Sequence, residues 1–221
     1  DGTWEKVKLF EVPHSITVDG DTYTLGKKFF NSPDAIVQYA NDYIYLGTGD
    51  RVHPNETGYT DCMFAIKNDW SGGTADITDL VDVTDNLIQD GTEAEQDAVG
   101  AQLESSKGWF MRMENSGEKV VSTPTVYQGN VYFTTFTPDS TGGAGGVDPC
   151  ELDEAKGVAR LYAVKYDSGA SVFNFHEDPP PAEGEEPAGK DKQDRSLIVG
   201  TAIPSAPVVA VLEGDDPTPP P

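Results

Sequence analysis

The residues best suited to chemistry are oxygen-bearing side chains that lie close together in the sequence. Asp82, Asp85, Asn86 and Asp90 form one such group. Carboxylate and amide oxygens are the ligands that Ca²⁺ prefers in proteins. The sequence therefore predicts a calcium site at these four residues. A solvated face stays open as the alternative, because aspartates recur every three residues between positions 76 and 85.

A second group of this kind lies in the loop between residues 50 and 61. It consists of Asp50, Asn55, Glu56 and Asp61, again with oxygen atoms that suit Ca²⁺. Asn55 also opens an Asn-Glu-Thr sequence, the acceptor pattern for N-glycosylation, which has meaning only on a suitable export pathway.

The residue types that usually carry catalysis form no recognisable pattern. His14, His53 and His176 fall in separate expected loops, and their spacing does not indicate a shared metal. The sequence contains no G-x-S-x-G nucleophile motif, and its glycine run at 142–146 lacks the lysine of a phosphate-binding loop. We therefore expect a protein that is not an enzyme and whose one candidate cofactor is Ca²⁺.

The two cysteines, Cys62 and Cys150, are far apart and have no zinc-binding spacing. Each comes just before an expected strand, so a Cys62–Cys150 disulfide is geometrically plausible in an exported protein. Two buried thiols are the alternative.

The chain is strongly acidic, with a formal net charge of −23 from 38 Asp and Glu against 15 Lys and Arg in 221 residues. Such a surface repels phosphates, so we expect neither nucleic acid nor an anionic membrane as a direct partner. No run of residues approaches the length of a transmembrane span, which excludes membrane insertion through a helix. The charge favours divalent cations or basic partners.

Short β-strands must position these residues. Residues 122–136 predict two strands joined by a tight turn at Gln128-Gly129-Asn130. Residues 32–49 repeat this pattern, and a matching strand follows each unit, at 62–69 and at 160–167. A third copy begins at Ser205. The repeated order of proline, strand, turn, strand, loop and strand is typical of radially repeated β-sheets, so the predicted fold is all-β.

One segment of different character, about 74–106, interrupts the strands. Thr92 and Glu95 have the spacing of a capping box and predict a helix from about 93 to 105. We expect this helical insertion to pack on the outside or at one end of the β-structure.

The remaining segments complete a domain predicted to span residues 1–214. Strands are expected within 1–12 and at 171–175, and Asp19-Gly20 predicts a hairpin. Residues 176–195 are rich in Pro, Glu and Lys and predict a disordered or solvated loop. Residues 215–221 form a Pro-rich tail.

The order of several short motifs resembles the C-terminal β-propeller domain of the PilY family, adhesins and assembly factors of type IV pili. The matching pieces are Trp4 to Phe10 (WEKVKLF), Tyr45 to Gly49 (YLGTG), Phe64 to Asn68 (FAIKN), Gly108 to Phe110 (GWF), Gly117 to Val120 (GEKV), Val131 to Thr135 (VYFTT), Asp148 to Cys150 (DPC) and Ile203 to Ser205 (IPS). They run through most of residues 4–210, although strands such as VYFTT occur in quinoprotein-type propellers generally.

The resemblance implies an extracellular or cell-surface, exported module that acts in pilus assembly and surface adhesion. Its implied partners are minor pilins, with a host or abiotic surface as adhesive target. The chain departs from the family because it holds two blade-like units and the start of a third, and because the EF-hand-like calcium loop is missing. Another chain, or more of a longer polypeptide, would have to supply the missing blades.

Two alternatives remain. The chain could be a fragment of a quinoprotein-like enzyme, which would need Ca²⁺ and a stacking tryptophan from among Trp4, Trp70 and Trp109. It could also be the subunit of an extracellular filament in which open sheet edges pair between copies.

Overall fold

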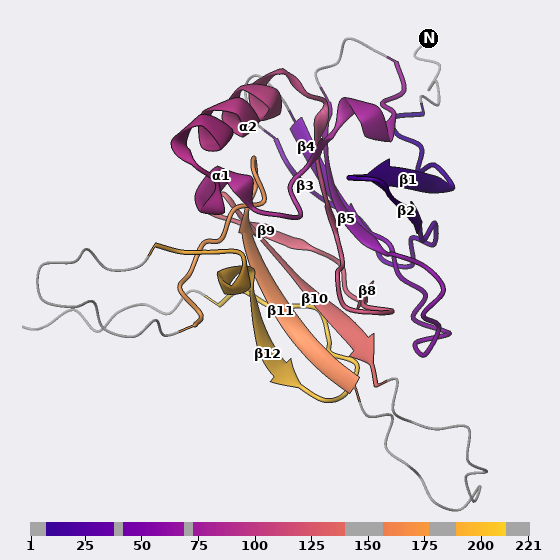
Figure 1. Ribbon diagram of the computed structural model, residues 1–221. Coiled ribbons are helices and arrows are strands. Elements are labelled where there is room, and N and C mark those ends of the chain that lie inside the picture. The colour runs from indigo at the N-terminus through magenta and orange to yellow at the C-terminus, as the bar shows by residue number, and fades with distance from the viewer. Residues whose placement is uncertain (1–7, 38–41, 69–72, 140–156, 177–188, 211–221) are drawn as a thin grey trace, which may run out of the picture.

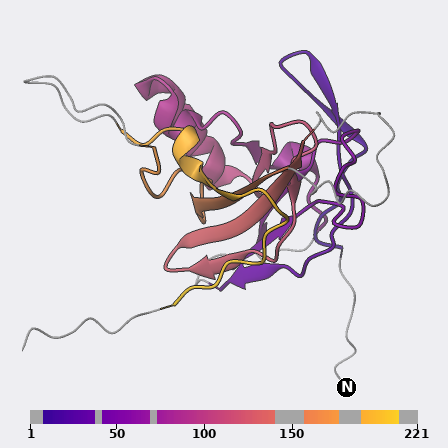
Figure 2. The ribbon, with the colours of Figure 1, turned by 90° about the horizontal axis from the view of Figure 1, so that it is seen from below.

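The described residues form two five-stranded β-sheets and a separate two-stranded hairpin (Figure 1). This computed structural model describes residues 8–37, 42–68, 73–139, 157–176 and 189–210. Helices α1 (Leu87–Asp90) and α2 (Glu93–Ser105) lie side by side at one end of the sheets (Figures 1 and 2). The fold is all-β, a partial propeller-like array of mostly antiparallel sheets with one short helical insertion, as the sequence predicted.

The first sheet has the strand order β3-β4-β5-β7-β6. Its strands are β3 (Asp34–Ile36), β4 (Asp42–Gly47), β5 (Cys62–Asn68), β6 (Val81–Asp82) and β7 (Gly108–Arg112). All neighbours are antiparallel except β6, which runs parallel to β7. Both faces of β5 are buried, which accounts for its continuous apolar run.

The second sheet has the order β12-β11-β10-β8, and β9 also pairs with β10. Its strands are β8 (Lys119–Val120), β9 (Thr125–Tyr127), β10 (Asn130–Pro138), β11 (Gly157–Lys165) and β12 (Ser196–Gly200). The pairing of β9, β10 and β11 repeats that of β3, β4 and β5. The two predicted repeat units are therefore confirmed.

The turn between β9 and β10 is the tight connection that the sequence predicted. Gln128 and Gly129 both have positive φ, at 48° and 75° respectively. Two central residues with positive φ give a turn whose twist matches that of the flanking strands.

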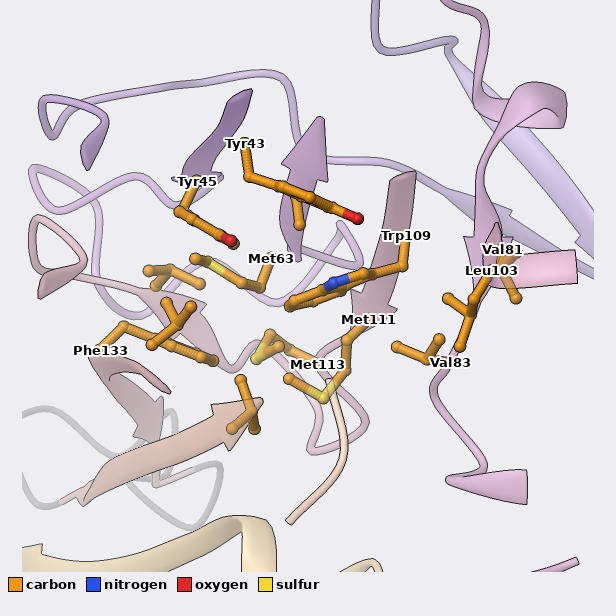
Figure 3. Packing of buried hydrophobic residues seen from close by; sticks show 14 residues of the cluster. Tyr43, Tyr45, Met63, Val81, Val83, Leu103, Trp109, Met111, Met113 and Phe133 are labelled. Atoms are coloured by element: carbon orange, nitrogen blue, oxygen red, sulfur yellow. The ribbon is translucent and has the colours of Figure 1, made fainter. Parts of the chain in front are cut away.

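The main core lies between the two sheets (Figure 3). Its fully buried members include Tyr45, Met63, Trp109, Val131 and Phe133. The Trp109 Nε1 and Tyr45 Oη atoms both donate to the backbone oxygen of Tyr166, at 3.1 and 3.0 Å. The polar atoms of these two buried rings are thus satisfied, as buried aromatic donors require.

A second apolar cluster covers the opposite face of the first sheet. Phe64 and Phe110 project from β5 and β7 into this cluster, where they meet Leu25, Ile77 and Leu80. The first sheet is consequently buried on both sides.

The helical insertion comprises η1 (Ile77–Asp79), α1 (Leu87–Asp90) and α2 (Glu93–Ser105). The predicted helix at 93–105 is confirmed, and so is its capping box, since the Thr92 backbone nitrogen donates to Glu95 Oε2 at 2.8 Å. Leu103 joins α2 to the main core. None of the described helices is long and apolar enough to cross a membrane.

The hairpin predicted at Asp19-Gly20 is also confirmed. It joins β1 (Ser15–Val18) to β2 (Asp21–Thr24) in an antiparallel pair.

The strand predicted at 171–175 is wrong. Ser171 makes one isolated bridge to Val164, and no regular strand follows it. Within the strand predicted at 1–12, residues 8–12 contain only an isolated bridge at Phe10, and residues 1–7 lie outside the described part of the chain.

The third copy of the repeat forms no strand in its described part, residues 205–210. The backbone oxygens of Ser205 and Pro207 accept hydrogen bonds from the side chains of Thr134 and Thr125 instead, at 3.0 and 3.2 Å. Apolar residues alone do not make a strand, because a strand also needs a neighbour that pairs with its backbone.

The prediction of a disordered or solvated loop at 176–195 is wrong for its last three residues, 193–195. Residues 189–195 are described, and they include a 3-10 helix, η2 (Gln193–Arg195). Asp194 and Arg195 are both buried, at 2% exposure. Residues 177–188 lie outside the described residues.

Candidate functional site

The four predicted calcium ligands belong to one short stretch beside the first sheet. Asp82 ends β6, and Asp90 ends α1. Between them Asn86 takes a left-handed conformation, with φ at 56°, and begins α1. Asparagine tolerates this conformation better than most residues, so the local sequence favours the tight turn. We call residues 82–90 the acidic turn.

Two carboxylates of the acidic turn accept hydrogen bonds from basic side chains. Asp82 Oδ2 accepts from Arg112 Nε at 2.9 Å, and its Oδ1 accepts from the Thr84 backbone nitrogen at 3.0 Å. Asp85 Oδ1 accepts from Lys192 Nζ at 3.1 Å. The same Lys192 Nζ also donates to Glu114, at 2.8 Å.

The other two residues of the predicted site are bound to protein groups as well. Asn86 Nδ2 donates to Asp90 Oδ1 at 3.2 Å, and Asn86 Oδ1 accepts from Arg195 Nη2 at 3.0 Å. Asp90 Oδ2 accepts from the Lys192 backbone nitrogen at 2.9 Å. Three of the donors thus come from Lys192 and Arg195, far along the chain.

Arg195 is the centre of this arrangement. Besides Asn86, its guanidinium donates to the backbone oxygens of Val83 and Thr84, at 2.7 and 2.9 Å. Burial lowers the pKa of Arg195 to about 10. Because Lys192 and Arg195 donate to Asp90 and Asn86, η2 lies beside α1 (Figures 1 and 2). The acidic turn therefore holds residues 189–195 against the insertion.

Calcium binding at the acidic turn stays a prediction. The described part of the chain contains no group of three or more His, Cys, Asp or Glu side chains arranged to hold a metal ion. A calcium ion would have to displace Arg112 from Asp82 and Lys192 from Asp85. The structure supports the turn as a link between segments.

The second acidic group, in the loop 50–61, divides into separate contacts. Asp50 is buried and accepts from Lys28 Nζ, and from His53 Nδ1 at 2.8 Å. The hydrogen bond from Lys28 holds the pKa of Asp50 well below its usual range. Asn55 and Glu56 are exposed. The described hydrogen bonds of Glu56 use its backbone: its nitrogen donates to His53 O at 3.2 Å, and its oxygen accepts from Lys119 Nζ.

Asp61 is a buried carboxyl of this loop whose pKa is raised. It is 4% exposed, and burial raises its pKa to about 6. Burial also lowers the pKa of Lys119, which lines the same cavity. That cavity has a volume of about 30 Å³, which suffices for a water molecule but not for an organic substrate.

A buried carboxylate that sequence reasoning missed is Glu118, 1% exposed, next to β8. It accepts from Thr135 Oγ1 at 2.6 Å, Tyr162 Oη at 3.1 Å and Asn115 Nδ2 at 2.5 Å. These donors come from β10, β11 and the turn before Glu118. No local pattern marks Glu118 as buried, because its partners Thr135 and Tyr162 are distant in sequence.

Among the described residues, the predicted histidines do not share a site with one another. His53 and His176 each contact one aspartate, Asp50 and Asp194, and they lie in separate loops as predicted. Cys62 is buried in β5, whereas Cys150 lies outside the described residues, so their disulfide stays a prediction.

The quinoprotein alternative requires a tryptophan that can stack on a quinone. Trp109 is fully buried in the main core and is not available for such stacking. Trp4 and Trp70 fall in the ranges that the structure leaves undescribed.

Comparison with known proteins gives one structural likeness to report. No family model matches the sequence, and no curated protein matches it. The crystal structure of the Pseudomonas aeruginosa PilY1 C-terminal domain is similar to 72% of this chain, with a TM-score of 0.44 and 11% sequence identity. The match covers 34% of that structure, so this chain spans about a third of its length. Similarity at this level establishes neither family nor function.

Proposed function

We propose that the chain is a non-enzymatic extracellular module of a type IV pilus-associated protein. It acts in pilus assembly and surface adhesion through protein–protein contacts, with minor pilins as its partners. The ordered sequence motifs that resemble the PilY family point to this setting. The single structural observation that supports it is an array of two blade-like sheets with an open strand edge at β12.

The polar groups described above are consistent with a binding module. Asp82, Glu118 and Arg195 each bind two or more protein groups, and they join segments that are distant in sequence. Groups bound in this way stabilise an arrangement of sheets. An open sheet edge, in contrast, offers backbone donors and acceptors to another chain.

The proposal is tested in the native polypeptide in its own cells. Deletion of residues 8–210 is expected to abolish surface pili and adhesion, while an immunoblot shows the truncated protein exported at the normal level. Co-purification of minor pilins with the intact protein, and their loss from the deletion variant, would support the assigned partners. Normal pilus number and normal adhesion in the deletion strain would refute the proposal.

The purified chain offers a second check that does not depend on the cell. A quinone absorbance band in the purified protein would support the enzyme alternative and overturn the non-enzymatic assignment.

A further inference from the structure

Strand β12 lies at an edge of the second sheet (Figure 1), and its exposed side chains are apolar. It pairs with β11 and with no other described strand. Three consecutive side chains in it are exposed, Leu197 by 39%, Ile198 by 63% and Val199 by 50%. Natural edge strands usually carry a charge, a proline or a β-bulge that limits further pairing. Residues 196–200 contain no charge and no proline, but the register of β12 against β11 shifts between Ile198 and Gly200, so the regular open edge is confined to residues 196–198.

The hydrogen-bond pattern shows which backbone groups of β12 point outward. Tyr166 N donates to Gly129 O at 3.1 Å, and Gly157 N donates to Thr201 O at 3.2 Å. Because bonding direction alternates along antiparallel strands, these bonds make Leu161 and its partner Leu197 a hydrogen-bonded pair. The N–H and C=O groups of Ile198 then point away from β11, toward the open edge.

The other edges of the two large sheets are short or engaged. In β3, the Asp34 carboxylate accepts from the Val126 nitrogen of β9 at 2.7 Å. β8 has two residues, and its Val120 nitrogen donates to Thr48 O at 3.1 Å. β6 also has two residues and lies against α2. Among the described edges of these sheets, β12 is therefore the one that combines length, exposed apolar side chains and outward backbone groups.

We infer that β12 is a strand-addition site for an extended segment of another protein. The segment pairs with the outward groups of Ile198 and carries apolar residues at alternate positions, which pack on the side chains of β12. Lysine or arginine occupies the positions between them, because the chain carries a net charge of −23 and attracts a basic partner. A second copy of this chain would be repelled by the same charge.

This inference deepens the proposed function, and it rests on that function for its biological setting. Its test, however, measures binding by the purified chain. If the peptide does not bind, the strand-addition inference fails but the proposed function is not contradicted. If the deletion strain has normal pili, the proposed function fails but the measured peptide binding is not contradicted.

The probe is a ten-residue peptide that alternates valine and lysine, titrated into the full ¹⁵N-labelled chain. Binding is expected to shift the amide signals of residues 196–200 and to slow hydrogen exchange at the Ile198 amide. Ile198→Pro removes that donor from the outward side of an edge strand, where proline is tolerated. We expect this variant to bind at least about tenfold more weakly, equivalent to about 1.4 kcal/mol.

Two further variants separate loss of binding from loss of structure. Ile198→Lys keeps the backbone donor and repels the basic peptide, so weaker binding is expected in a chain with normal thermal stability. Val208→Asp changes a residue that is 89% exposed outside the sheets, and it should bind as the unmodified chain does. A valine–glutamate peptide and a Val–Lys peptide N-methylated at its valines should not bind.

Several results would overturn the inference. Absence of binding at millimolar Val–Lys peptide would do so, as would equal binding by the valine–glutamate peptide. Unchanged affinity in both Ile198→Pro and Ile198→Lys would exclude β12 as the site. Sedimentation that shows a dimer abolished by Ile198→Lys would assign the edge to a second copy.

Discussion

Replacement of Arg195 by methionine tests whether the segment before β12 is anchored. Arg195 is 2% exposed, and its guanidinium donates to Val83 O, Thr84 O and Asn86 Oδ1. Methionine has a similar length and leaves these three acceptors without their donor. We therefore expect Arg195→Met to destabilise the protein and to release residues 189–195.

The expected magnitude follows from two opposing effects. Hydrogen bonds from a charged donor contribute about 1.5–3 kcal/mol each, so three of them contribute about 4–9 kcal/mol. Burial of the guanidinium, which lowers its pKa to about 10, costs about 3 kcal/mol, and methionine avoids that cost. The difference between the two predicts a decrease of about 1.5–6 kcal/mol in the free energy of unfolding.

Urea unfolding measures this change. At an m-value of about 2–3 kcal/mol/M, the urea midpoint should fall by about 0.5–3 M. Limited proteolysis should show faster cleavage within 189–195. The matched control is Lys192→Met, because Lys192 lies on the same segment but makes solvent-exposed ion pairs, which contribute at most about 1 kcal/mol. If Arg195→Met destabilises no more than Lys192→Met does, the segment is the solvated loop that its composition indicates.

Three other substitutions or titrations give further checks. Asp61→Asn should become more stable relative to the unmodified chain as pH rises from about 4 to about 7. The pKa of Asp61 is raised from a usual 3.8 to about 6, so its ionisation destabilises the folded chain by about 3 kcal/mol above pH 6 and has no such effect below pH 4. Parallel urea titrations of the two proteins that show no pH-dependent difference would contradict this. Gly47→Ala should destabilise by about 1–3 kcal/mol, since its added Cβ would lie 2.4 Å from Val120 Cγ1, whereas Gly58→Ala meets open space and should change little in thermal melts. Millimolar Ca²⁺ should leave the melting temperature unchanged because basic groups occupy the acidic turn; a rise that Asp85→Asn abolishes would instead establish the predicted calcium site.

The features that the sequence predicts well are those with local causes. The hairpin at Asp19-Gly20 depends on two residues that accept positive φ, and the helix at 93–105 depends on a capping box within its first turn. The repeated strand units were recognisable because β10 and its counterpart carry branched and aromatic side chains. Each of these signals lies inside the element that it specifies.

The errors concern residues whose partners are distant in the chain. The third copy at 205–210 has the apolar composition of a strand, yet no described strand pairs with it. Arg195 lies in a stretch with few apolar residues, so composition alone indicates a loop, and its acceptors Val83 and Thr84 are more than one hundred residues away. The basic groups that bind the predicted calcium ligands Asp82 and Asp85 come from Arg112 in β7 and from Lys192, both distant in the chain.

The buried residue Arg195 and the open edge of β12 are adjacent in the chain. Arg195 is the last residue of η2, and β12 begins at the next position, Ser196. The guanidinium fixes the start of β12 to the acidic turn, while pairing with β11 fixes the strand along its inner side. A strand held in this way does not lose further conformational freedom when a partner pairs with its outer side, and preorganisation of that kind strengthens binding. The cost of burying Arg195 is therefore consistent with a structure that must keep β12 extended and open.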